Sequence, residues 1–180
     1  MELRGSKTEK NLYKTFAGES RARTKYSLYA EQAKCEGYVW ISQIFEETAE
    51  NEKAHARLAF KTFLELIGTT EENLLDAAKG EREETAKTYK EFEQTAKEEG
   101  FDDIAKFYKE LREIEEDHCK RYAILYEKLK NDKLFMSSKE KMWRCLNCGY
   151  IYEGCEAPEI CPACKYPQSF FKPYCKDEAY

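Results

Sequence analysis

Hydrophobic residues recur at intervals of three or four through most of positions 6–130. This spacing places them on one face of an α-helix. Proline is absent from this part of the chain and glycine is sparse. The pattern predicts four helices, over 6–36, 38–67, 70–99 and 101–130. Ser6 is expected to cap the first helix, because Glu9 follows three residues on, as in a capping box.

Each predicted apolar face contains a glutamate at mid-helix, and the chain's only two histidines follow two of these glutamates at i+3. Residues i and i+3 share a helix face, so each pair aims a carboxylate and an imidazole the same way. An ion pair with Lys or Arg explains any one of them, but four buried carboxylates together are costly without cations. A four-helix bundle of this design holds two iron or manganese ions. The candidate ligands are Glu19, Glu52, His55, Glu81, Glu115 and His118.

An internal repeat supports this interpretation. The stretch 37–55 matches 100–118 at an offset of 63 residues, and Gly18-Glu19 matches Gly80-Glu81 at an offset of 62. The first and second helix pairs are therefore predicted to be two copies of one helical hairpin, related by a pseudo-twofold axis. Glu84 has no counterpart in the first copy, and this extra carboxylate should make the two metal positions inequivalent.

The composition changes after residue 130. Residues 131–142 are polar and predict a linker, and all four prolines lie in 143–180. This last segment is too short to hold itself together by a hydrophobic core alone. Its two C-x-x-C pairs, twelve residues apart, indicate one tetrahedral metal with four thiolate ligands. Such a set suits both iron and structural zinc. The predicted ligands are Cys145, Cys148, Cys161 and Cys164.

Net charge and the lack of long apolar stretches bear on the protein's partners and location. The formal net charge of −5 gives no electrostatic argument for nucleic acid or an anionic membrane as a partner. No stretch approaches the roughly 20 apolar residues of a membrane span, and the first residues lack the apolar run of a signal peptide. We therefore expect a cytoplasmic protein, where cysteines stay reduced. The cysteines outside the metal site are expected to be free thiols: Cys35, Cys119, Cys155 and Cys175.

Four stretches together resemble the rubrerythrin family over nearly the whole chain. They are Phe16-Ala-Gly-Glu19-Ser, Glu52-Lys-Ala-His55-Ala, Gly80-Glu81-x-x-Glu84 and Cys145-Leu-Asn-Cys148-Gly-Tyr. The resemblance implies a mainly α protein. Its ferritin-like four-helix bundle occupies residues 1–130 and is followed, after the linker 131–142, by a rubredoxin-like domain at 143–180. It implies a carboxylate-bridged di-iron site in the bundle and favours iron over zinc between the four cysteines.

The resemblance also implies roles for the carboxylates. By position, Glu19 is a terminal ligand of one iron ion and Glu81 of the other. Glu52 and Glu115 bridge the two ions. His118 binds the second ion.

The remaining implied roles concern a ligand exchange and two tyrosines. Glu84 binds the first ion in the oxidised site and gives way to His55 on reduction. Tyr26 and Tyr89 fall where the family has tyrosines that hydrogen-bond the site's carboxylates. Their alternative interpretation is ordinary core aromatics.

The activity implied by the resemblance is reduction of hydrogen peroxide to water, in defence against oxidative stress. Two ferrous ions hold the two electrons that cleave one O–O bond, and the thiolate-bound iron refills them singly. Because the chain has no Gly-rich nucleotide fingerprint, the electrons should come from a separate NAD(P)H-dependent reductase or a rubredoxin. The alternatives are a ferroxidase or iron-binding protein, which does not need a redox tail, and an electron-transfer module with zinc in the tail.

The connection near Gly68 bears on oligomeric state. Bundles of this kind run their second and third helices parallel, with a long crossover between them. The few residues available reach only about 10–15 Å, whereas the crossover needs roughly 40 Å. We therefore expect a domain-swapped homodimer, in which the first hairpin of one chain packs on the second hairpin of the other. A simple up-down-up-down bundle is the alternative.

Overall fold

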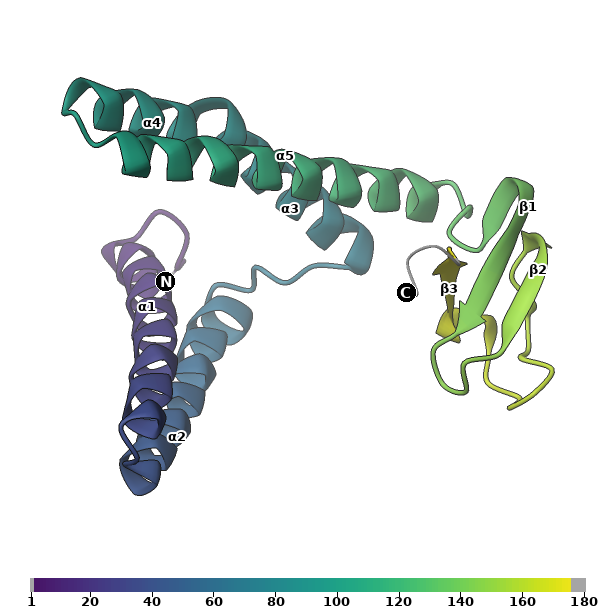
Figure 1. The fold of residues 1–180 in the computed structure, drawn as a ribbon, viewed down its shortest axis with the longest axis horizontal. Coiled ribbons are helices and arrows are strands. Elements are labelled where there is room, and N and C mark those ends of the chain that lie inside the picture. Colours follow the sequence, from purple (N-terminus) through teal and green to yellow (C-terminus); the bar gives the residue numbers. More distant parts are fainter. Residues whose placement is uncertain (1, 176–180) are drawn as a thin grey trace. The chain divides into compact units, whose positions relative to one another are not determined.

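The computed structural model describes residues 2–175, which form two units divided between Thr69 and Thr70. The first unit is an antiparallel hairpin of α1 (Lys7–Cys35) and α2 (Val39–Arg57), which the π-helix η1 (Leu58–Phe63) extends (Figure 1). The Oγ of Ser6 accepts a hydrogen bond from the Glu9 amide and caps α1, as predicted. The second helix ends at Phe63 rather than at the predicted residue 67. The left-handed backbone of Glu65, with φ of 51°, lies just beyond that end.

Small side chains let α1 and α2 pack closely. Ala30, Ala33 and Ala49 are buried, and the buried Ser42 hydroxyl donates a 2.8 Å hydrogen bond to the carbonyl of Ala30. Gly37, with φ of 86°, turns the chain from one helix into the next, in a conformation that costs glycine little. The fully buried residues of this hairpin are therefore small ones, which allow the two helix backbones to approach closely.

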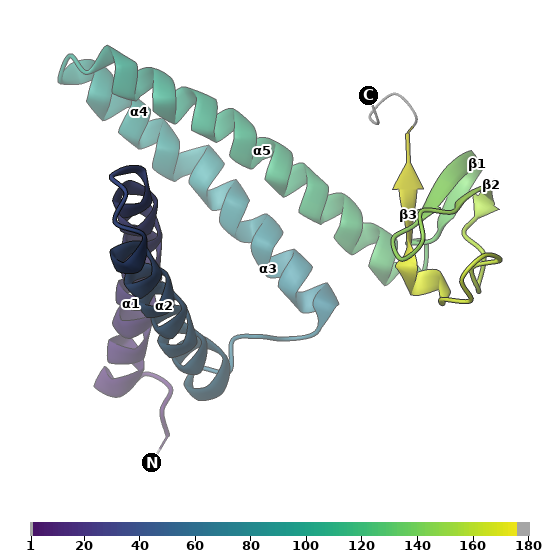
Figure 2. The same ribbon diagram turned by 60° about the horizontal axis from the view of Figure 1, so that its bottom comes forward.

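The second unit contains a matching hairpin, in which a continuous helical run packs against α5 (Asp102–Lys130) (Figure 2). The run consists of α3 (Thr70–Glu83), the π-helix η2 (Glu84–Thr88) and α4 (Tyr89–Glu98). The repeat offset is 62 residues before η2 and 63 after it. A π-helix accommodates one extra residue without breaking the helix, so η2 explains the unequal lengths of the two repeats.

Aromatic pairs show that the two hairpins are copies in space as well as in sequence. The rings of Tyr26 and Phe45 stack with centroids 6.2 Å apart in the first hairpin. At the matching positions, the rings of Tyr89 and Tyr108 stack at 6.1 Å. The predicted repeat of one helical hairpin is therefore a structural repeat.

One position pair distinguishes the second hairpin. Glu93 and Arg112 stand where the first hairpin has Ala30 and Ala49. Only 9% of the Glu93 side chain is exposed; its Oε1 lies 2.6 Å from Lys97 Nζ and its Oε2 3.2 Å from Arg112 Nη1. These cations lower the pKa of Glu93, the hydrogen bond with Lys97 most strongly. The ion pair replaces the close alanine contact of the first hairpin.

We expect Glu93→Ala alone to destabilise the second hairpin more than the double replacement Glu93→Ala/Arg112→Ala. The single variant leaves the Arg112 guanidinium in the helix seam without its partner, whereas the double variant recreates the alanine pair of the first hairpin. Circular dichroism at 222 nm should show a midpoint several degrees lower for the single variant, and partial recovery for the double. A double variant less stable than the single one would contradict this.

The C-terminal sheet consists of three antiparallel strands in the order β2-β1-β3. They are β1 (Met136–Cys145), β2 (Ile151–Glu156) and β3 (Phe171–Tyr174), with a 3₁₀ turn η3 (Gln168–Phe170) before β3. Strand β1 begins inside the stretch 131–142 that the sequence predicts to be a linker, because pairing with β2 already occurs at Met136. The domain boundaries themselves stay a prediction.

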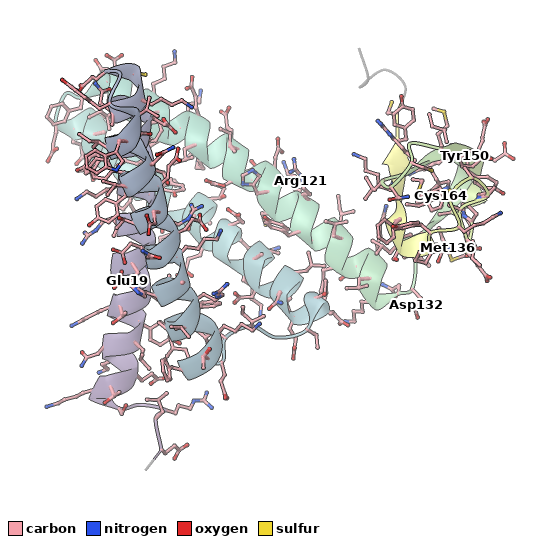
Figure 3. All side chains as sticks on the ribbon, turned by 90° about the horizontal axis from the view of Figure 1, so that it is seen from below. Glu19, Arg121, Asp132, Met136, Tyr150 and Cys164 are labelled. Atoms are coloured by element: carbon pink, nitrogen blue, oxygen red, sulfur yellow. The ribbon has the colours of Figure 1, made fainter. Side chains whose placement is uncertain are left out.

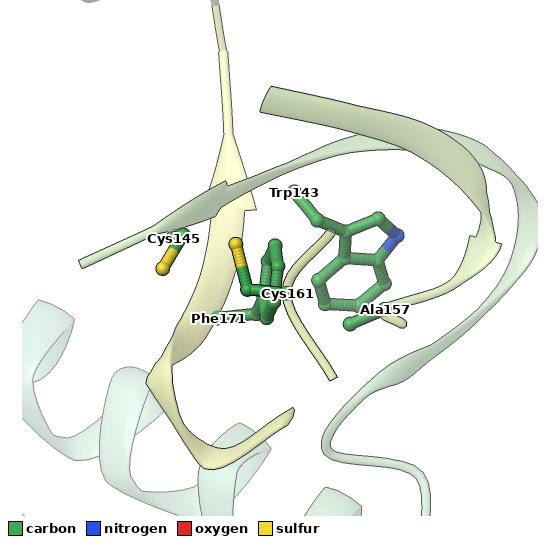
Figure 4. Close-up of a cluster of buried hydrophobic side chains, with 5 residues drawn as sticks. All are labelled: Trp143, Cys145, Ala157, Cys161 and Phe171. Atoms are coloured by element: carbon green, nitrogen blue, oxygen red, sulfur yellow. The ribbon is translucent and has the colours of Figure 1, made fainter. Parts of the chain in front are cut away.

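The sheet covers a small core (Figure 4). Trp143 is 1% exposed, and its indole N–H donates to the carbonyl of Gly154 at 3.0 Å. Ala157, Phe171 and two of the predicted metal-binding cysteines complete the buried cluster. The thiols therefore belong to the core itself. Among residues 2–175, no helix has both the length and the apolar character that crossing a membrane requires.

Candidate metal centres

The first carboxylate–histidine cluster lies within the α1–α2 hairpin. One ligand atom each from Glu19, Glu52 and His55 falls within 4.8 Å of the others, and Figure 3 shows Glu19 on α1. His55 Nδ1 lies 2.9 Å from Glu52 Oε2 and 3.8 Å from Glu19 Oε2. The i, i+3 spacing on α2 brings the imidazole and one carboxylate together, and α1 supplies the second carboxylate.

The second cluster repeats this geometry in the α3–α5 hairpin. One ligand atom each from Glu81, Glu115 and His118 lies within 4.8 Å of the others. His118 Nδ1 is 2.7 Å from Glu115 Oε2 and 3.7 Å from Glu81 Oε1. Each hairpin therefore presents two carboxylates and one imidazole in the same arrangement, which is half of the ligand set expected for a di-metal bundle.

The electrostatics of both clusters favour a bound cation. A hydrogen bond with Glu52, followed by burial, raises the pKa of Glu19. Burial, followed by a hydrogen bond with Glu115, raises the pKa of Glu81. Adjacent carboxylates resist simultaneous ionisation unless a proton or a metal ion lies between them. Oxygen and imidazole donors of this kind suit iron and manganese, so the residues fit a di-metal site.

Glu84, and the hydrogen bond that Tyr89 makes with it, distinguish the second cluster from the first. Glu84 begins η2, and Tyr89 follows directly after that π-helix. Burial, followed by a hydrogen bond with Glu84, raises the pKa of Tyr89 to about 12. The phenol therefore keeps its proton and can donate it in a hydrogen bond to this carboxylate. Tyr26, its counterpart, stacks on Phe45, and its predicted hydrogen bond to the site stays a prediction.

The four predicted cysteines meet in one cluster. Their sulfurs lie within 4.8 Å of one another, with Cys145 and Cys164 3.7 Å apart and Cys148 and Cys161 also 3.7 Å apart. Tetrahedral coordination with bonds of about 2.3 Å places sulfurs roughly 3.8 Å apart. Cys164 is labelled in Figure 3. The cluster therefore matches a four-thiolate metal site in both ligand type and spacing.

Two similar turns build this site. The amide of Gly149 donates to Cys145 O and that of Lys165 to Cys161 O, both at 2.9 Å. Both donors have positive φ, 79° for the glycine and 64° for the lysine. Each loop thus turns back on itself, and its two thiols face the same point. Sequence reasoning missed one further contact: a hydrogen bond from Asn147 lowers the pKa of Cys164 to about 6. Its only signal is an amide side chain between the two ligating cysteines Cys145 and Cys148.

The remaining cysteines lie outside these clusters. Cys119 donates to the carbonyl of Ala78 at 3.3 Å, and therefore packs on α3 instead of joining the neighbouring imidazole. Cys35, Cys155 and Cys175 are exposed, and all are free thiols in this structure.

Comparison with known proteins agrees with this geometry. The rubrerythrin family model matches residues 10–71 and 72–149, and the model described as "Rubrerythrin, rubredoxin-like domain" matches 143–172. Rubrerythrin-1 of Clostridium acetobutylicum is 44% identical and covers 94% of this chain and 95% of its own. Rubrerythrin of Porphyromonas gingivalis is also 44% identical, covering 95% and 92%.

A more distant relative has a solved structure. Nigerythrin in a mixed-valence state is 30% identical and covers 96% of this chain and 91% of its own, with a TM-score of 0.36. The two family models together match the residues of both helical hairpins and of the cysteine site. The chain belongs to the rubrerythrin family, with a di-iron domain and a C-terminal rubredoxin-like site.

Proposed function

We propose that this protein reduces hydrogen peroxide to water. One observation carries the proposal: a single chain of this family holds two matching carboxylate–histidine clusters together with a four-thiolate site. Iron held by the two carboxylate–histidine clusters would supply the two electrons that cleave the O–O bond, and iron held by the four thiolates would return them one at a time. The overall reaction takes up two electrons and two protons for each peroxide and yields two waters. This chemistry serves defence against oxidative stress.

The chain's residues would hold the two ions in unlike surroundings. Glu19 and Glu81 would serve as terminal ligands, and Glu52 and Glu115 would bridge. The second hairpin has the further candidate ligand Glu84, whose matching position in the first hairpin is Ala22 and which the Tyr89 phenol engages.

The two histidines complete this assignment. His118 would bind one ion, and His55 would exchange with Glu84 at the other as the oxidation state changes. The side chain of His55 is 55% exposed and that of His118 is 37% exposed, so the exchanging ligand is the one with more room to move.

The electrons are proposed to come from outside the chain. A rubredoxin or an NAD(P)H-dependent reductase would deliver them to the four-thiolate site, where Cys148 is exposed. An exposed ligand gives a donor protein a short path to the metal. We place this reaction in the cytoplasm, in agreement with the expected reduced state of the thiols.

We further propose that the two hairpins meet across a domain-swapped dimer. Glu52 lies 11 residues before the end of η1, and Glu81 lies 11 residues after the start of α3, about 16 Å in each case. If the second and third helices run parallel, their connection must span the sum of these two helical lengths, about 33 Å. The connection 64–69 reaches at most about 25 Å. Two chains that exchange hairpins remove this conflict.

Exposed apolar side chains support hairpin pairing. Both hairpins carry large hydrophobic residues that are about half exposed, which is typical of surfaces that pack against a partner. Examples are Ile41, Ile44 and Leu58 in the first hairpin and Ile104, Ile114 and Ile124 in the second.

Complementation tests both the site and the exchange of hairpins. Glu52→Ala disables the first half-site and Glu115→Ala the second, so each homodimer should lose peroxide turnover. In a swapped heterodimer of the two variants, one bundle combines two intact hairpins and the other combines two disabled ones. Differently tagged chains, co-expressed and purified through both tags, should therefore regain about half of wild-type turnover.

The outcomes separate the two proposals. If both homodimers and the heterodimer are inactive, the assignment of the metal ligands stands but the domain swap is wrong. Each bundle would then lie within one chain. Homodimers that keep full turnover would reject the assignment of both glutamates.

A further inference from the structure

A basic groove lies on the surface of the α1–α2 hairpin, where Phe16, Phe60 and Ile67 contribute apolar lining to a hollow of about 410 Å³. The two phenyl rings have centroids 4.7 Å apart. The groove has four cationic side chains and no acidic one in its lining: Arg23, Lys53, Arg57 and Lys61. An apolar floor is thus combined with a concentrated positive charge, although the whole chain carries a net charge of −5.

The positive charge of the basic groove is poorly matched within the protein. Arg23 and Lys53 share the carboxylate of Glu50, at 3.7 Å and 2.9 Å. Across residues 2–175, neither Arg57 nor Lys61 lies within ion-pair distance of a carboxylate. The Nε of Arg23 is buried and has no hydrogen-bond partner. Buried donors without partners are rare in proteins and call for an explanation.

The internal repeat shows that the hairpin fold does not require these cations. At the matching positions of the second hairpin, Lys53 is replaced by Glu116 and Lys61 by Ile124. Lys120, which matches Arg57, pairs with Glu116 at 3.0 Å and with Asp117 at 3.5 Å. The second hairpin therefore neutralises the charge that the first leaves unmatched.

We propose that the basic groove binds a small phosphorylated molecule that also carries an aromatic or other apolar group. A phosphate presents several acceptor oxygens to the guanidinium and ammonium groups that line the groove, including the exposed part of the Arg23 side chain. The apolar part would lie on Phe16 and Phe60. The volume falls within the range of small-molecule sites. This site is separate from the proposed peroxide reaction, and its cations are not metal ligands.

Isothermal titration calorimetry of the full-length, metal-loaded protein at low salt tests this proposal, with adenosine 5′-monophosphate and inorganic phosphate as probes. The nucleotide should bind at least about tenfold more tightly than phosphate, because only the nucleotide uses the apolar floor. Arg57→Ala/Lys61→Ala should weaken nucleotide binding about tenfold or more and leave peroxide turnover unchanged. The matched control is Lys79→Ala, in the corresponding groove of the second hairpin, and it should bind as the wild type does.

Three results would overturn the proposal. If neither probe binds, the proposed site does not exist. The same conclusion follows if only an acidic peptide binds. Equal affinity for the two probes would reject a role for the aromatic floor. Undiminished nucleotide binding by Arg57→Ala/Lys61→Ala would place the site elsewhere, such as at a metal centre.

Discussion

Cys161→Ser is expected to abolish the visible absorption of the thiolate-bound iron and to lower peroxide turnover with an external electron donor by about 100-fold or more. The sulfur of Cys161 is fully buried and lies 3.7 Å from that of Cys148. Its removal leaves three thiolates for a metal that needs four. Peroxide turnover should fall by at least the roughly 10- to 100-fold that follows removal of a residue supporting a metal ligand.

A single-turnover measurement separates the two metal centres in this variant. Pre-reduced Cys161→Ser protein should still consume one round of peroxide, because the carboxylate–histidine clusters lie on other elements of the chain. Cys155→Ser is the matched control, since Cys155 is an exposed thiol of the same sheet outside the metal cluster. Loss of the single round as well would show that the centres do not have separate roles.

Glu84→Ala is expected to slow peroxide turnover by about 10- to 100-fold while the fold and the thiolate-bound iron remain intact. Glu84 is the only proposed ligand without a counterpart in the first hairpin, and it is the hydrogen-bond partner of Tyr89. Without it, one ion loses the carboxylate proposed to replace His55 on oxidation. Turnover under saturating donor, measured beside circular dichroism, reports this change.

Glu83→Ala provides the control for Glu84→Ala. Glu83 is the neighbouring carboxylate, directly before the same π-helix, but it is exposed whereas Glu84 is half-buried. This variant removes the same net charge and should retain wild-type turnover. If Glu84→Ala and Glu83→Ala behave alike, the role assigned to Glu84 is wrong.

The metal clusters could be predicted from the sequence because their geometry is local. The i, i+3 spacing of Glu52 and His55 is sufficient to bring a carboxylate and an imidazole together once a helix forms. The paired cysteines likewise indicate their site by spacing alone. The repeat extends the first of these inferences to Glu115 and His118, since one hairpin predicts the other.

Features that depend on tertiary contacts were not predictable in this way. The π-helix η2 shifts hydrogen bonds inside an otherwise regular helix, and the apolar pattern does not show where the extra residue is accommodated. Strand β1 starts at Met136 because β2 pairs with it, although its own sequence is polar. Glu93 is buried where it meets Arg112 of another helix, a contact between helices that the pattern along one helix does not show.

The most direct test of the central claim is a stopped-flow visible spectrum of anaerobic, fully reduced protein mixed with hydrogen peroxide. The charge-transfer bands of ferric iron bound by four thiolates should return in step with peroxide loss, as electrons pass from the cysteine site to the carboxylate–histidine site. Peroxide consumption without any return of these bands would contradict this claim, because the four-thiolate site would then not supply the electrons.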